Sequence, residues 1–198
     1  MTVLRTALPK LLFESVLIVF SILLALSVSE CSERSNRQER AEVALDNIRA
    51  EIASNAASLR RIVPYHQQML ARLDLLLADS ASVLRSQGVI GTISRIAPEG
   101  LQPPTLGSTA WGIATTTDAI SRIDYAQVYV LSRLYQIQHM GVETTVPRLS
   151  ELLLARETFQ TEQDPLPSLR LLQLILNELV TQEQFLLQRY TEVLGAND

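Results

Sequence analysis

Apolar residues recur at alternating steps of three and four along most of the chain, which is the spacing of one face of an α-helix. The longest seam of this kind is Leu45, Ile48, Ile52, Asn55, Leu59, Ile62, His66, Met69, Leu73, Leu76, Ser80 and Val83. It predicts one very long helix over about 32–84, which would extend for about 80 Å at 1.5 Å per residue. Pro64 lies inside this range and, because it lacks a backbone donor, predicts a kink in the preceding turn.

The segment 85–108 is dense in glycine and proline, and it predicts a long loop after the first helix. We expect helix again from about Thr109, a break near Ile123, and a new helix that Asp124 caps. The helix that follows has its own seam, which includes two polar steps: Val128, Leu131, Tyr135, Gln138, Val142, Thr145, Leu149 and Leu152.

The last helix is marked at both ends. Asp164-Pro165 is a capping residue followed by a residue suited to a first turn, and Gly195 is a typical stop. The soluble part of the sequence has no convincing strand pattern. Helices that each bury one stripe pack well as an antiparallel bundle, so the sequence predicts an all-α fold with a helical bundle domain over 45–198.

The segment 11–29 is apolar on all sides rather than on one face. It reads LLFESVLIVFSILLALSVS and carries a single charge, at Glu14. About 20 apolar residues cross the ~30 Å of bilayer hydrocarbon as a helix, so this segment predicts a transmembrane helix after a short tail, 1–10. A cleaved signal peptide is the alternative, because Ala25 and Ser27 are small residues that suit a cleavage site.

Four residues of this segment fall on one helical face: Glu14, Ser21, Ala25 and Ser29. Small residues spaced by four let two membrane helices approach closely, so this face is predicted to associate with another helix. Glu14 either marks a partner or reaches the headgroups beside Lys10, one turn earlier.

A charged helical neck is predicted over 30–44, where acidic residues precede basic ones by four positions, as in Glu30/Arg34 and Glu33/Arg37. Basic residues on the two sides of the apolar segment are nearly balanced, so charge alone does not orient the chain. A short head before an apolar run is typical of an uncleaved signal anchor. We therefore expect the N-terminus in the cytoplasm and the bundle outside it.

Composition excludes several classes of protein. The 198 residues suit one modest domain, and a single cysteine rules out a disulfide framework within the chain or a Cys-rich metal site. A net charge of −4 without a basic patch argues against nucleic acid as a partner. We find no HExxH, CxxC, G-x-S-x-G or phosphate-loop motif, so we expect no catalytic residue, cofactor or metal.

Polar residues at seam positions are the remaining candidates for a site. Asn55 and His66, with Gln138 and His139 on the later helix, are predicted inter-helix polar contacts. They either fix helix register, or line an inter-helix pocket or form a contact that responds to pH. Trp111 is expected to form a core cluster with Tyr125 and Tyr129.

The chain resembles a family of uncharacterised bacterial single-pass membrane proteins. The resemblance lies in Glu14-x-x-Leu17-Ile18-Val19-x-Ser21-Ile22-Leu23-Leu24-Ala25-Leu26, in the charged run after it, in Ile48-x-x-Glu51-Ile52-x-x-Asn55, and more weakly in Ala110-Trp111 and Tyr135-Gln136-x-Gln138. It implies attachment to the bacterial inner membrane and a helical domain, and no activity. Unlike many of these proteins, the chain has Glu30-Cys31 where an aromatic residue would follow the anchor.

These patterns favour a non-enzymatic, membrane-anchored helical bundle that associates with itself or with another membrane or envelope protein, the lipid bilayer being its first partner. A ligand-sensing bundle that signals through a partner is the alternative. An enzyme is a third hypothesis, because a missing motif does not exclude a site.

Overall fold

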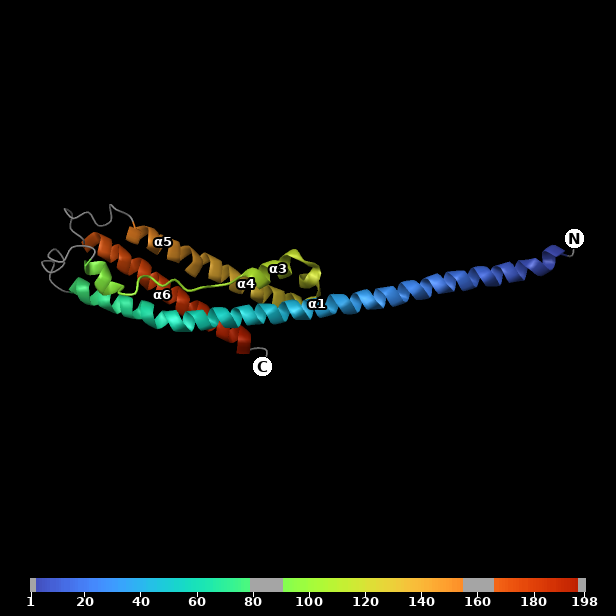
Figure 1. The fold of residues 1–198 in the computed structure, drawn as a ribbon, viewed down its shortest axis with the longest axis horizontal. Helices are drawn as coiled ribbons and strands as arrows, with labels where there is room; N and C mark the ends of the chain where they lie inside the picture. The colour runs from blue at the N-terminus through green and yellow to red at the C-terminus, as the bar shows by residue number, and fades with distance from the viewer. Residues whose placement is uncertain (1–2, 79–90, 155–165, 196–198) are drawn as a thin grey trace.

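The computed structural model of the chain describes residues 3–78, 91–154 and 166–195 (Figure 1). Within these ranges the regular elements are all helical, which confirms the all-α prediction. They are α1 (Val3–Ala78), α3 (Thr109–Thr116), the short 3₁₀ helix η1 (Asp118–Arg122), α4 (Tyr125–Met140), α5 (Val142–Leu154) and α6 (Leu166–Gly195). Residues 91–96 are helical as well.

Helix α1 is a single continuous helix, and its great length confirms the prediction of a very long first helix. Its 76 residues correspond to about 114 Å. It passes through Pro64 without a break, while Ile62 and Val63 before the proline and Met69 after it are all buried. Packing thus holds the helix together where one backbone hydrogen bond is lost. The seam positions Ser80 and Val83 lie outside the described residues.

Only the second half of α1 lies against the other helices, and the first half projects away from them (Figure 1). Helix α6 runs back along α1 in the opposite direction. Three contacts show this order: Gln173 bonds to Asp74 at 2.6 Å, Glu183 to His66 at 2.9 Å, and Tyr190 to Asn55 at 3.5 Å. The core of the domain contains Ile48, Ile52, Leu59, Leu73, Leu149, Leu176, Leu179 and Leu186, all without exposed surface.

The seam that begins at Val128 is divided between α4 and α5, which meet at Gly141. Its amide bonds to the carbonyl of Ile137 at 2.9 Å. A Cβ atom at this position would lie 2.9 Å from that same oxygen, so only glycine fits here without a shift. At the other end of α4, the Asp124 carboxylate accepts hydrogen bonds from the amides of Ala126 and Gln127, as predicted for a cap.

The segment 85–108 was expected to be one long loop, and the structure differs in part. Residues 91–96 form a helical turn, with Ile96 buried in the core, and residues 79–90 lie outside the described part. The predicted cap at Asp164-Pro165 also lies outside it, whereas α6 ends at Gly195, where the sequence places its stop.

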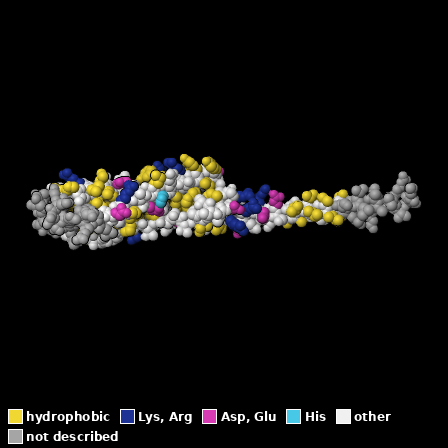
Figure 2. All heavy atoms as spheres, turned by 90° about the horizontal axis from the view of Figure 1, so that it is seen from above, with side chains coloured by type: hydrophobic (Ala, Val, Ile, Leu, Met, Phe, Trp, Pro, Cys, Tyr) yellow, Lys and Arg dark blue, Asp and Glu magenta, His cyan; other side chains and the backbone are white. Residues whose placement is uncertain are grey.

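The projecting half of α1 includes a stretch that by length and composition could cross a membrane. None of that stretch is buried inside the structure. Figure 2 shows its apolar side chains next to a band of mixed charges, beyond which the packed helices begin.

Candidate functional site

Residues 97–108 connect the helical turn 91–96 to α3, and they run along α1 in the opposite direction. An irregular segment has no helical or sheet partners for its backbone groups, which must find others where they are buried. Side chains of α1 supply these partners. The contacts are Tyr65 hydroxyl to Gly100 carbonyl at 2.6 Å, Thr105 amide to Ser58 hydroxyl at 3.0 Å, and Gly107 amide to Asn55 Oδ1 at 2.7 Å. We call residues 97–108 the strap.

The strap bends sharply at Gly100 and Gln102, whose φ angles are +76° and +47°. Left-handed backbone suits glycine and is uncommon for glutamine. The carbonyl of Leu101, between them, accepts a hydrogen bond from His66 Nε2 at 2.7 Å. The bend therefore delivers a backbone acceptor to a buried histidine.

His66 and Glu183 form a pair with no exposed side-chain surface. His66 Nδ1 lies 2.9 Å from both carboxylate oxygens, while Nε2 faces the Leu101 carbonyl. A neutral imidazole has one N–H, so it cannot donate to both acceptors. The geometry requires one additional proton, held as an imidazolium or shared with the carboxyl group. Burial by itself lowers the pKa of His66, but the hydrogen bond and charge of Glu183, with the Leu101 carbonyl, raise it above 6.5 overall.

A second buried polar cluster joins α1, α4 and α6. Asn55 pairs with both backbone groups of Gly107, accepting from the amide at 2.7 Å and donating to the carbonyl at 2.8 Å. Its Nδ2 also lies 3.4 Å from Gln138 Oε1, to which the Tyr190 hydroxyl donates at 2.6 Å. Gln138 Nε2 donates to Glu143 at 2.6 Å. Burial raises the pKa of Tyr190, so this hydroxyl stays a donor at ordinary pH.

The structure thus brings Asn55 and Gln138 together and places His66 in a separate inter-helix contact. His139 does not join either cluster, because its side chain is 79% exposed and its contact is with nearby Glu143 at 3.1 Å. It follows Gln138 by one position and so points off the buried face. Glu183 was not among the residues predicted from the sequence, although its place in the spacing Leu179, Glu183, Leu186, Tyr190 puts it on the buried face of α6.

Glu51 attaches the start of α3 to α1. Its carboxylate accepts from the amides of Ala110 at 2.9 Å and Trp111 at 3.4 Å, and from the Tyr135 hydroxyl at 2.7 Å. Ser108, at the N-cap position of α3, makes no such side-chain bond. A carboxylate at a helix N-terminus also interacts favourably with the helix dipole, so Glu51 takes the place of the missing cap.

The aromatic cluster expected around Trp111 is wrong in its members. Tyr125 and Tyr129 are 82% and 56% exposed. Trp111 instead stacks on Tyr135, with ring centroids 5.4 Å apart and planes 9° apart. Tyr135 lies on the seam of α4, four positions after the buried Leu131, so its ring faces the core. Its pKa is raised by burial and by Glu51, so it remains a hydrogen-bond donor.

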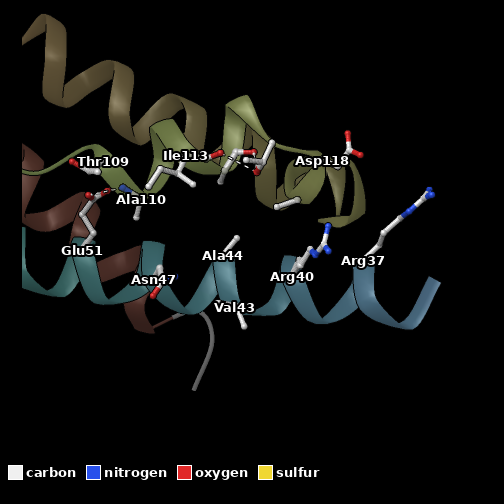
Figure 3. Close-up of a pocket in the computed structure, with 13 residues that line it drawn as sticks. Arg37, Arg40, Val43, Ala44, Asn47, Glu51, Thr109, Ala110, Ile113 and Asp118 are labelled. Atoms are coloured by element: carbon white, nitrogen blue, oxygen red, sulfur yellow. Dashed lines mark hydrogen bonds between the residues drawn. The ribbon is translucent and has the colours of Figure 1, made fainter. Parts of the chain in front are cut away.

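A cleft of about 600 Å³ lies between α1 and the α3–η1 segment (Figure 3). Much of its lining is alanine, and these small side chains leave the space open: Ala44, Ala110, Ala114 and Ala119. Pockets of this size with apolar walls and few polar groups are typical binding sites for small molecules.

Charged residues line the cleft at both ends, and they differ in what they contact. Glu51 is occupied by the backbone of α3, and Arg37 forms an ion pair with Glu33 at 2.8 Å. Asp118 points away from α1, whereas Arg40 points from α1 towards η1 (Figure 3). Arg40 makes no ion pair with any residue that the structure describes.

The predicted membrane face lies on the projecting part of α1. Ser21, Ala25 and Ser29 are exposed on one side of the helix, and the Ser21 hydroxyl bonds to the Leu17 carbonyl at 2.8 Å. The side chain of Glu14 is outside the described residues. The described ranges contain no group of three or more His, Cys, Asp or Glu that could hold a metal ion.

The pH dependence of stability tests the buried pair. The folded pKa of His66 lies above 6.5, so the pair's contribution is complete below about pH 6.5 and is lost as pH rises through the folded value. We expect the free energy of unfolding to fall as the pH rises above about 6.5. Urea titrations of the detergent-solubilised protein, followed by the fluorescence of the single tryptophan, measure this.

Two variants of α6 separate this pair from other titrating groups. Glu183→Gln removes the carboxylate that raises the histidine pKa, so the loss of stability with rising pH should flatten. Glu178→Gln changes an exposed carboxylate on the same helix, bonded to Gln182, and should keep the wild-type slope. Equal slopes in the two variants would contradict the assignment of the proton to the pair.

The attachment of α3 is tested at Glu51. Glu51→Ala removes the acceptor for three donors, and we expect a loss of about 1–3 kcal/mol of stability with a red shift of Trp111 emission. Glu42→Ala is the matched control, because Glu42 lies on the same helix, is exposed and bonds only to Gln38 among the described residues. An unchanged emission maximum in Glu51→Ala would show that α3 is held by other contacts.

Comparison with known proteins identifies no relative of this chain. No protein-family model, no curated protein and no solved structure matches it. The resemblance to uncharacterised bacterial membrane proteins therefore stays a prediction.

Proposed function

We propose that this chain is a single-pass membrane protein whose helical domain acts by association, with itself or with another membrane protein, and catalyses no reaction. One observation carries the proposal. The large apolar side chains of α1 from Phe13 to Val28 are each between 54% and 68% exposed, and no part of the described chain covers them (Figure 2). Apolar surface of this extent on a single helix is stable in bilayer hydrocarbon and costly in water.

The continuity of α1 supports an anchor over a cleaved signal peptide. The same helix contains the apolar stretch, the charged neck over 30–44 and the buried seam of the domain. For this anchor we propose a cytoplasmic N-terminus, with the domain on the outer side of a bacterial inner membrane. On the apolar stretch, the small residues Ser21, Ala25 and Ser29 form the face that suits a second helix.

A ligand-sensing domain is the second candidate function, and the cleft beside the neck favours it. The cleft is lined by α1 on one side and by α3 and η1 on the other. An occupant would therefore contact the helix that carries the apolar stretch, and a change there would pass along α1. The signal would then need a partner in the membrane.

Membrane attachment and orientation are tested together by fusing, after Asp198, a reporter that is active only outside the cytoplasm and, separately, one active only inside. We expect activity outside, at full length, in a membrane fraction that alkaline carbonate does not release. A shortened, soluble product would identify a signal peptide, and activity inside would reverse the orientation. Either result would contradict the proposal as stated.

Association through the small-residue face is tested by sedimentation of the full chain in detergent. Ala25→Phe places a large ring on the predicted face and should weaken self-association about tenfold or more. Leu23→Phe makes a change on the opposite side of the same helix and should leave self-association unchanged. A monomeric wild-type chain would turn the proposal towards a different partner protein, and equal effects of the two variants would exclude this face.

A further inference from the structure

The cleft between α1 and the α3–η1 segment has one charged group free to meet a ligand. Of the four charged residues that line it, Glu51 and Arg37 already have partners and Asp118 points away from α1. Arg40 points across the cleft towards η1 and makes no ion pair with a described residue (Figure 3). A guanidinium in this position matches a carboxylate or phosphate group.

The rest of the lining is suited to an unbranched apolar chain. Ala44 on α1 faces Ala110 and Ala114 on α3, and Ile113 adds a larger apolar side chain that is 59% exposed. Leaving Ile113 in water costs free energy that an apolar ligand would recover. The cleft therefore combines an apolar wall with a cationic end, which is the complement of an amphiphile.

Distance along α1 decides which amphiphile fits. Arg40 follows Ser29 by eleven positions, or about 16 Å of helix, whereas the headgroup layer on one side of a bilayer is only about 5–8 Å thick. If the apolar stretch spans the membrane, the cleft opens into water just above the headgroups. A lipid with two chains stays in the bilayer, but a single chain binds a bilayer weakly and reversibly.

We propose that this cleft binds a long-chain fatty acid, with the carboxylate against Arg40 and the chain along the alanines of α1 and α3. The proposal rests on the second candidate function, the ligand-sensing domain. It does not depend on self-association. The occupant would connect α1 to α3 at the point where Glu51 already holds these two helices together.

The test uses the full chain in nanodiscs of phosphatidylcholine, with radiolabelled palmitate as the probe and empty nanodiscs as the background. We expect saturable binding above that background. Arg40→Gln should weaken palmitate binding about tenfold. It should not change the binding of 1-hexadecanol, which has the same chain without the charge. Arg34→Gln removes a neck arginine that does not line the cleft, and it should bind palmitate as the wild type does.

Ala44→Leu places a larger side chain in the cleft and should weaken the binding of both palmitate and 1-hexadecanol. Trp111 emission and circular dichroism report whether this variant keeps its fold. If it does not, the comparison of palmitate binding by Arg40→Gln and Arg34→Gln tests the proposal. No saturable binding by the wild type, or equal palmitate binding by Arg40→Gln and Arg34→Gln, would overturn the proposal. Resistance to carbonate extraction, measured on the same protein, shows separately whether the anchor holds.

Discussion

The packing of the domain depends on hydrogen-bond partners for the backbone of the strap. Residues 97–108 cross the surface of α1 without a helix or sheet of their own, so their polar groups depend on side chains of another element. Helix α1 meets this need with side chains between Asn55 and His66, each at a position where the strap presents an amide or a carbonyl. The polar steps in an otherwise apolar seam follow from this requirement. Replacing Asn55 or His66 with leucine would complete the seam, but it would take the side-chain partner from the Gly107 amide or from the Leu101 carbonyl.

The two buried clusters hold different parts of the fold. The His66–Glu183 pair joins α1 to α6, and His66 Nε2 joins it to the bend of the strap. Asn55, Gln138 and Tyr190 join α1, α4 and α6 beside Gly107. Between them, these contacts set the register of three helices, which apolar packing alone specifies less sharply. Glu51 holds α3 against α1 in a similar way, because its carboxylate accepts from the amides of the first turn of α3, which has no side-chain cap of its own.

Much of the fold could be read from spacing, and the site could be read only in part. The three-four periodicity predicted most of the helices, a very long first helix, and the buried positions Asn55, His66 and Gln138. It could not predict their partners, because Glu183 looks like a surface residue until α6 is placed against α1. His139 shows the other limit, since one position off the seam is enough to expose it. The predicted partners of Trp111 were wrong for a related reason. Tyr125 and Tyr129 are nearer to Trp111 in sequence, but Tyr135 is the tyrosine that α4 packs against it.

The continuity of α1 has a geometric consequence for the neck. Each residue of an α-helix turns the chain by about 100°. The number of residues between Ala25 and Arg40 therefore sets the angle about the helix axis between the face of Ser21 and Ala25 and the cleft that Arg40 lines. One inserted residue would rotate the domain about its anchor by more than a quarter turn, while seven would nearly restore the angle and lift the domain by about 10 Å. The number of residues in the neck thus encodes an orientation as well as a height.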